Sequence, residues 1–261
     1  MNFGLIVIGD EILSGRRQDK HMARVIEILA ARGHPLAWCQ YVGDDRPRIV
    51  AALRLAMGSG DAVFSCGGIG ATPDDHTRQC AALASGRELV LHPQAKALIE
   101  ERMREVAQEQ GTDYDPDRPD NQHRLNMGVF PVGAQIIPNP YNKIPGFSLG
   151  QLHFVPGFPV MAHPMIEWVL DQHYAGLAPT PYEERSLFVC GGMEASLTPL
   201  MEAIEAEHPG VRVFSLPSVD DPRRGRHIEL GVKGAPAAVA AAFAALQTGL
   251  RRDPTLSIST E

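Results

Sequence analysis

The stretch Ser65-Cys66-Gly67-Gly68-Ile69-Gly70-Ala71-Thr72-Pro73-Asp74-Asp75-His76-Thr77 decides the fold that the sequence predicts. The segment before it, Asp61-Ala62-Val63-Phe64, is short, apolar and β-branched, which predicts a buried parallel strand. Residues 77–84 after it predict a helix. Three glycines therefore lie between a strand end and a helix start. Because glycine tolerates positive φ and has no Cβ, the backbone N–H groups of this loop can converge on an anion near the positive end of the helix.

Two adjacent carboxylates, Asp74 and Asp75, follow the glycines. A loop that only holds phosphate is not expected to place carboxylates beside the anion. A site that also holds a divalent metal ion, or that needs a general base, does use them. The alternative interpretation is an ordinary helix start, with Asp or Thr as the N-cap. The loop alone leaves both interpretations open; we expect Asp74 to cap the helix and Asp75 to face the ligand.

Alternating strands and helices precede the glycine loop. The predicted order is a strand at residues 5–8, a helix at 19–32, a strand at 35–42, a helix at 49–57, and then the strand and helix that flank the loop. This β-α-β-α-β-loop-α order is typical of an open, mainly parallel sheet. Later strands are expected at 135–137 and 151–155, and later helices at 94–110, at 121–127 and from 159 to about 173.

Each of the first three strands ends in a pair of acidic residues. Ligands of open parallel sheets bind beyond the carboxyl ends of the strands, so we expect the three pairs to point at one crevice. The alternative is that these carboxylates only cap three helix starts. The pairs are Asp10 with Glu11, Asp44 with Asp45, and Asp74 with Asp75.

The composition is that of a soluble globular protein. The chain has 261 residues, of which 44% are hydrophobic and 21% charged. Its net charge of -7 argues against a broad nucleic-acid surface. The four cysteines show no CxxC spacing, no signal peptide opens the chain, and no apolar run is long enough to span a membrane. We therefore expect a cytoplasmic protein with reduced thiols that binds neither nucleic acid nor membrane.

The C-terminal part of the sequence predicts a separate unit. Residues 175–184 are rich in proline and small residues and are expected to be a linker. Residues 185–250 predict a β-α-β-β-α order, which is typical of a small α+β domain. Residues 251–261 are expected to be disordered. The predicted main domain is residues 1–174.

Five motifs occur in an order that identifies a family. They are Gly9-Asp10-Glu11-Ile12-Leu13-Ser14-Gly15, Val42-Gly43-Asp44-Asp45, the glycine loop from Gly67 to Thr77, the segment from Asn139 to Phe147, and Pro156-Gly157-Phe158-Pro159. Over residues 3–174 the chain resembles the molybdopterin-binding domain of the competence/damage-inducible protein A (CinA) family. The resemblance implies a three-layer α/β/α fold with an open, mainly parallel sheet, shared with molybdenum cofactor biosynthesis proteins.

The sequence departs from the family pattern at three places. Ala71 stands where members often have proline, Asn142-Lys143-Ile144 replaces Gly-Thr-Ala, and Val160-Met161 replaces a Glu-Met pair. The last departure removes a carboxylate from the expected crevice. Lys143 adds a cation near the expected anion, which is consistent with phosphate binding.

Two function classes remain open. In the first, the protein binds a phosphorylated, molybdopterin-type pterin, or a similar ligand that carries pyrophosphate, and acts in molybdenum cofactor metabolism. In the second, which the resemblance also implies, it is a metal-dependent pyrophosphohydrolase that cleaves ADP-ribose or FAD with Mg²⁺, Mn²⁺ or Co²⁺. The predicted catalytic residues are then Asp75 and Asp44, and the predicted metal ligands are Asp44, Asp74 and Asp75. In both classes we expect a homo-oligomer whose partner is a small phosphorylated ligand.

The predicted ligand-binding residues come from the glycine loop, the acidic strand ends and the two later motifs. They are Gly9, Asp10, Glu11, Gly67, Gly68, Gly70, Thr72, Asp74, Thr77, Asn139, Lys143, Pro145, Gly146, Pro156 and Gly157.

Overall fold

The computed structural model describes residues 1–179 and 181–260, and the chain divides into two compact units after Pro179. The first unit carries the glycine loop, and its boundary lies five residues beyond the predicted one. No helix of the described residues is both long and apolar enough to cross a membrane.

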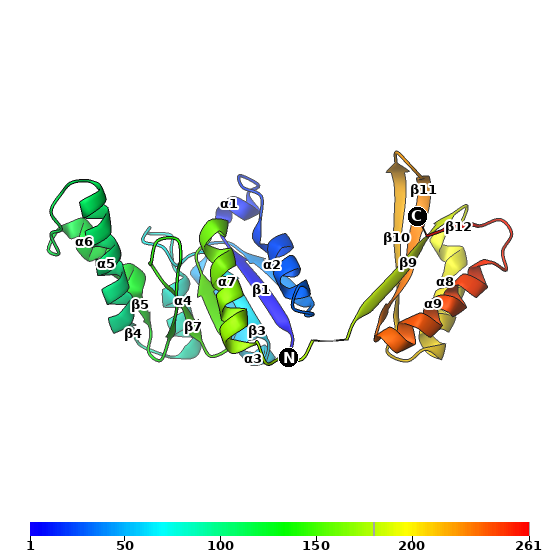
Figure 1. The fold of residues 1–261 in the computed structure, drawn as a ribbon, viewed down its shortest axis with the longest axis horizontal. Coiled ribbons are helices and arrows are strands. Elements are labelled where there is room, and N and C mark those ends of the chain that lie inside the picture. The colour runs from blue at the N-terminus through cyan, green and yellow to red at the C-terminus, as the bar shows by residue number, and fades with distance from the viewer. Residues whose placement is uncertain (180, 261) are drawn as a thin grey trace. The chain divides into compact units, whose positions relative to one another are not determined.

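A six-stranded sheet organises the first unit (Figure 1). Its order is β2-β1-β3-β8-β7-β6; β2, β1, β3 and β8 pair in parallel, and β7 pairs antiparallel with both β8 and β6. The mainly parallel sheet predicted from the sequence is confirmed. The strands are β1 (Phe3–Ile8), β2 (Leu36–Val42), β3 (Ala62–Cys66), β6 (Gln135–Ile137), β7 (Gly146–Leu149) and β8 (Leu152–Val155).

Helices cover both faces of this sheet, because alternate residues of its central strands belong to two different hydrophobic cores. Leu5 and Val7 of β1 pack with α2 and α7, whereas Ile6 and Ile8 pack with α3 and α4. Figure 1 shows α2 and α7 on the near side of the sheet. The predicted three-layer arrangement is confirmed. The helices of these layers are α1 (Asp10–Leu13), α2 (His21–Ala30), α3 (Arg46–Ser59), α4 (Thr77–Ser85) and α7 (Pro159–His173).

A smaller subregion lies between α4 and β6 in the sequence. Its two antiparallel strands pair with each other, and the long helix expected at 94–110 is present as α5. The helix expected at 121–127 is an α-helical turn followed by a 3-10 turn. The elements are β4 (Leu89–Leu91), α5 (Pro93–Glu109), α6 (Pro119–Arg124), η1 (Leu125–Gly128) and β5 (Val129–Pro131).

Strand β7 was not predicted, because its sequence follows a run of loop-forming residues. Gly146, predicted to bind ligand, is instead its first residue and is buried. A Cβ at this position would lie 2.3 Å from the carbonyl oxygen of Phe154, so glycine allows β7 to approach β8. Gly146 therefore serves the sheet.

The second unit is a four-stranded antiparallel sheet with two helices packed on one face. Its core includes Leu187 of β9, Leu230 of β11 and Leu246 of α9. The predicted β-α-β-β-α order is present, and the strand order is β10-β11-β9-β12. The elements are β9 (Glu183–Cys190), α8 (Glu194–Glu207), β10 (Arg212–Asp221), β11 (Gly225–Gly234), α9 (Pro236–Leu250) and β12 (Ser257–Ser259).

The C-terminal segment differs from the disorder expected for residues 251–261. Residues 257–259 form β12, which pairs antiparallel with β9, and Ile258 packs against the core of the second unit. The segment is too short and too polar to show strand periodicity, but β9 offers it an open edge. Residue 261 lies outside the described residues.

Candidate functional site

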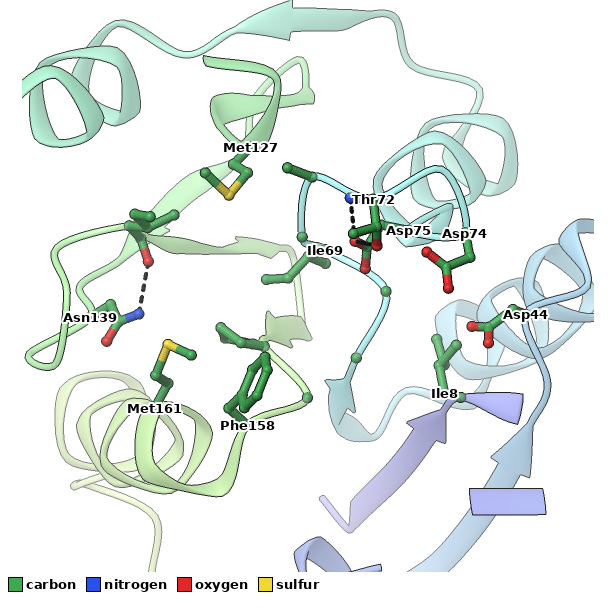
Figure 2. A pocket seen from close by; sticks show the side chains of 18 of the residues that line it. Ile8, Asp44, Ile69, Thr72, Asp74, Asp75, Met127, Asn139, Phe158 and Met161 are labelled. Carbon is green, nitrogen blue, oxygen red and sulfur yellow. Dashed lines mark hydrogen bonds between the residues drawn. The ribbon is translucent and has the colours of Figure 1, made fainter. Parts of the chain in front are cut away.

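A cavity of about 460 Å³ opens beyond the carboxyl ends of β1, β3 and β8, where ligands of open parallel sheets bind (Figure 2). The glycine loop forms one wall, and the two later motifs form another. Eleven predicted ligand-binding residues line this cavity, together with the predicted catalytic residues Asp44 and Asp75. The predicted lining residues are Gly9, Glu11, Asp44, Gly67, Gly68, Gly70, Thr72, Asp74, Asp75, Asn139, Pro145, Pro156 and Gly157.

The first two glycines of the loop are required by its backbone. Gly67 and Gly68 have φ values of 108° and 69°, which disfavour residues with a Cβ. A Cβ on Gly67 would lie 2.3 Å from the carbonyl oxygen of Ile8, and one on Gly68 would lie 2.1 Å from Oγ1 of Thr77. A side chain at Gly67 or Gly68 would therefore distort the loop even in the absence of a ligand.

Thr77 stabilises this loop through two hydrogen bonds to its backbone. Its Oγ1 donates a hydrogen bond to the carbonyl oxygen of Gly67 (3.0 Å), and its backbone N–H donates to Gly68 (2.9 Å). Thr77 is fully buried and does not line the cavity. We predicted Thr77 as a ligand-binding residue; in the structure it supports the loop instead.

Four consecutive backbone N–H groups of the loop are left for a ligand. The N–H of Gly67 donates to Val155, and that of Thr72 donates to Asp75. Within the described part of the chain, no hydrogen bond uses the N–H groups between them, at residues 68–71. Because these residues line the cavity, their unused N–H groups are candidates to bind phosphate oxygens there.

A buried arginine supports the same loop. Arg78, in the first turn of α4, is 4% exposed, and its Nη1 donates a hydrogen bond to the carbonyl oxygen of Ile69. Burial lowers the pKa of its guanidinium, and the charge of Asp75 opposes this shift. Arginine remains charged even so, which places a positive charge beneath the free N–H groups. Arg78 was not among the site residues predicted from the sequence.

Asp75 holds the end of the loop together. Its Oδ2 accepts a hydrogen bond from the backbone N–H of Thr72 (2.8 Å) and another from Oγ1 of Thr72 (2.5 Å) (Figure 2). Asp74 is exposed and points into the cavity mouth, and it does not cap α4, which begins at Thr77 after His76. The expectation that Asp74 caps the helix is wrong, because two further residues separate Asp74 from the helix start.

The other acidic pairs divide between two sides of the sheet edge. Glu11 and Asp44 line the cavity, whereas Asp10 and Asp45 line a separate groove. Asp10 and Asp44 bind each other's backbone: the N–H of Asp10 donates to Asp44 (2.9 Å), and the N–H of Asp44 donates to Asp10 (3.1 Å). Asp45 caps α3 by accepting from the N–H of Arg48. Asp10, predicted to bind ligand, therefore has a structural role here.

The carboxylate of Asp44 is held in an unfavourable electrostatic environment. Burial raises its pKa above the ordinary 3.8, and the charges of Asp10, Glu11 and Asp74 raise it further. A proton or a bound cation would relieve this repulsion. No group of three or more His, Cys, Asp or Glu side chains in the described residues is already arranged to hold a metal ion. Asp44, Asp74 and Asp75 could contribute to a metal site only together with oxygens of the ligand.

The raised pKa of Asp44 should make the stability of the fold depend on pH. Since the folded-state pKa of Asp44 is raised, the native protein binds more protons than the unfolded chain, and stability falls as the pH rises above 3.8. Asp44→Asn should therefore raise the melting temperature at pH 7, and the gain should shrink as the pH approaches 3.8. Asp45→Asn is the control, because Asn caps α3 as well as Asp does. A lower melting temperature for Asp44→Asn at pH 7 would contradict this expectation.

The two later motifs supply different kinds of contact. Asn139 is buried, and its side-chain amide donates to Asn142 (2.8 Å) and to the carbonyl oxygen of Ile144 (2.9 Å), which fixes the turn that carries Pro145. Lys143 does not line the cavity: its Nζ lies 2.6 Å from Oε1 of Glu101 and also binds Glu105 of α5. The expected cation for the ligand is thus neutralised by two carboxylates distant in sequence.

An apolar wall faces the glycine loop, and the sequence analysis did not predict it. Met127, Phe158 and Met161 lie on the side of the cavity opposite Asp44 and Asp74 (Figure 2), and Ile144 also lines the cavity. The remaining unpredicted lining residues are Ile8, Ile69, Ala71, Asn142 and Arg17, the last with an exposed guanidinium.

This combination of sheet, glycine loop and cavity defines a molybdopterin-binding-type domain. The model of the family described as "probable molybdopterin binding domain" matches residues 4–175, and the chain belongs to that family. The resemblance predicted from the sequence motifs is confirmed.

Among individual relatives, the chain is 32% identical over 217 residues to a CinA-like protein of Syntrophotalea carbinolica. That alignment covers 78% of this chain and 50% of the relative, so the chain spans about half the length of the CinA-like relative. Protein TV0584 of Thermoplasma volcanium is 29% identical, with 82% and 79% of the two chains covered. The solved structure of CinA from Thermoplasma acidophilum, described as of unknown function, superposes with a TM-score of 0.54 and 28% identity over 65% of this chain and 96% of that one.

Proposed function

We propose that the cavity binds a phosphorylated pterin of the molybdopterin type, and that the protein acts in molybdenum cofactor metabolism. The observation that carries this proposal is the row of free backbone N–H groups at residues 68–71, opposite the apolar wall of Met127, Ile144, Phe158 and Met161. The N–H groups suit the phosphate, and the apolar wall suits a flat heterocycle. A cavity of about 460 Å³ is large enough for a ligand of this size.

Charge supports the placement of the phosphate at the glycine loop. The rim of the cavity carries the carboxylates of Glu11, Asp44 and Asp74, which repel an anion. Beneath the loop, the buried charge of Arg78 attracts one. The phosphate is therefore expected against residues 68–71, with the rest of the ligand directed toward Phe158 and Met161.

Calorimetry with the 261-residue chain tests the proposal. A phosphorylated pterin should bind, and the same pterin without its phosphate should bind more weakly, because it makes no contact with the loop N–H groups. Equal affinity for the two ligands would show that the loop does not hold phosphate. No measurable binding of either one would overturn the proposal.

Phe158 should contribute to affinity through the heterocycle alone. Its side chain is 56% exposed at the cavity wall, so Phe158→Ala should leave the fold intact. Loss of an aromatic contact should weaken pterin binding by about tenfold, equivalent to about 1.4 kcal/mol. Affinity for inorganic pyrophosphate should not change. Val160, also 56% exposed but absent from the cavity lining, provides the control Val160→Ala. A Phe158→Ala protein that binds the pterin as tightly as the wild type would exclude this wall as the ring-binding surface.

A second candidate function is metal-dependent hydrolysis of a pyrophosphate in ADP-ribose or FAD. The specific observation in its favour is the raised pKa of Asp44 beside Asp74 and Glu11, because such a cluster gains stability when a cation binds. Asp75 would then act as general base or metal ligand. Incubation with ADP-ribose or FAD and Mg²⁺, Mn²⁺ or Co²⁺ should release AMP in this case. Unchanged substrate with all three metals would remove this candidate.

A further inference from the structure

A second pocket lies on the other side of the glycine loop. Its volume is about 330 Å³, and it shares Ala71, Thr72 and Asp75 with the first cavity. Arg46 from the start of α3 lines it together with His76 and Arg78 at the start of α4. Asp75 is the one carboxylate among its lining residues, and Oδ2 of Asp75 is engaged by Thr72. The pocket is therefore basic, in contrast to the acidic rim of the first cavity.

Arg46 and His76 form a hydrogen bond with each other and keep further N–H groups unused at this pocket. Nη2 of Arg46 lies 3.1 Å from Nδ1 of His76. Since a guanidinium can only donate, Nδ1 of His76 must accept, and the neutral ring therefore carries its hydrogen on Nε2. In the described part of the chain, neither this Nε2 nor the remaining N–H groups of Arg46 have a recorded acceptor. The pair thus presents several unused donors.

The arginines of this pocket also lack carboxylate partners. The ion pairs of the described residues include neither Arg46 nor Arg78, whereas Arg48, two residues further along α3, pairs with Asp45. An arginine held in place by a histidine rather than by a carboxylate keeps its full charge for an external anion. Guanidinium groups bind phosphate oxygens in a bidentate manner.

His123 of α6 fixes the outer wall of the pocket and does not supply a further donor. Its Nε2 lies 3.0 Å from the carbonyl oxygen of Ala71, which can only accept, and its Nδ1 then accepts from Asn126 (3.4 Å). Both ring nitrogens are satisfied by the protein. The recognition groups are therefore Arg46 and His76, with the buried charge of Arg78 behind them.

We infer that the pocket formed by Arg46, His76 and Arg78 binds a phosphate group, either inorganic phosphate or a phosphate monoester, separately from the ligand of the first cavity. The two anions would lie on opposite sides of one loop. Because Arg46 does not line the first cavity, this inference does not depend on which ligand that cavity holds.

Titration of the 261-residue chain with inorganic phosphate and with AMP tests the inference, using calorimetry and the NMR signals of the histidine rings. The His76 signal should shift on addition of phosphate. Arg46→Gln should weaken binding at least about tenfold, because it removes charge-assisted hydrogen bonds. Arg48→Gln is the matched control: it changes the net charge equally on the same helix, and its side chain is 81% exposed outside the pocket. It should bind as the wild type does.

The outcomes separate the sources of the phosphate. Tighter binding of AMP than of inorganic phosphate, with both dependent on Arg46, identifies a monoester site; equal binding identifies a site for free phosphate. Phosphate affinity that is unchanged in Arg46→Gln would overturn the inference. Arg46→Gln should leave the affinity for a phosphorylated pterin unchanged, so failure of this pocket is distinguishable from failure of the first cavity. Thermal unfolding of each variant confirms that it is folded.

Discussion

Replacement of Arg78 with methionine is expected to lower the affinity for a phosphorylated pterin about 100-fold, because a hydrogen bond from a charged group and a buried charge are lost together. The guanidinium holds the carbonyl oxygen of Ile69, within the part of the loop whose backbone N–H groups have no partner in the described residues. Methionine fills the same volume but can neither hold the carbonyl group nor attract an anion.

The fold should survive this change. Burial lowers the pKa of Arg78 because it disfavours the charged form, and the charge of Asp75 offsets part of this effect. Removal of that charge offsets the loss of one hydrogen bond, as happens when buried ions are replaced by apolar groups. We therefore expect a melting temperature close to that of the wild type.

Two comparisons identify the cause of the lost affinity. The pterin without its phosphate should bind Arg78→Met and the wild type equally. Arg78→Lys keeps the charge but cannot reproduce the planar fork, so it should recover part of the affinity and the salt dependence. If Arg78→Met bound both ligands as the wild type does, the buried charge would have no part in binding.

The parallel strands and the glycine loop could be predicted from the sequence, because both restrict the residue types that they accept. The parallel strands are continuous apolar runs, and Leu5 to Ile8 contact one core or the other on alternate residues. The glycine loop was predictable because positive φ and close backbone approach restrict its residue types. Strand β12 could not be predicted, because its three residues are too few to show periodicity. They form a strand because they pair with the edge of β9.

The acidic side chains show where local reasoning fails. Each pair follows a strand end, as predicted, but neighbouring side chains at a strand end point in different directions. Glu11 and Asp44 consequently line the cavity, whereas Asp10 and Asp45 do not; Asp44 also accepts from a backbone N–H group, as Asp10 and Asp45 do. Lys143 illustrates a second limit, since Glu101 and Glu105 reach it from α5, about 40 residues away in the sequence.

The apolar wall could not be predicted from the sequence either, because its residues come from separate segments. Met127 comes from a 3-10 turn, Ile144 from a loop, and Phe158 and Met161 from the start of α7. No single segment shows a pattern, because the wall exists only after three segments meet. Only Phe158 could have been singled out from the sequence, because a large aromatic residue in a Pro-Gly-x-Pro turn is not expected to reach the hydrophobic core. In the structure Phe158 is 56% exposed.

Asp75→Asn is expected to separate the two proposed functions. The change is nearly isosteric, and the Asn side-chain oxygen can still accept from the backbone N–H and Oγ1 of Thr72, so the loop should keep its shape. What disappears is one negative charge at the cavity, which now opposes the charge of Arg78. A protein that only binds a phosphorylated pterin should gain affinity by roughly fivefold, as expected for the loss of one weakly screened repulsion.

A hydrolase should respond in the opposite direction. If Asp75 activates water or holds a metal ion, Asp75→Asn should lower the release of AMP from ADP-ribose by about two orders of magnitude. Asp74→Asn is the comparison variant: it removes the same charge from an exposed side chain, whereas the backbone N–H of Thr72 is held by Asp75. In a binding protein it should raise pterin affinity less than Asp75→Asn does. Full hydrolytic activity in Asp75→Asn would remove the catalytic assignment, and a large loss of pterin affinity without metal would show that the carboxylate attracts the ligand rather than repels it.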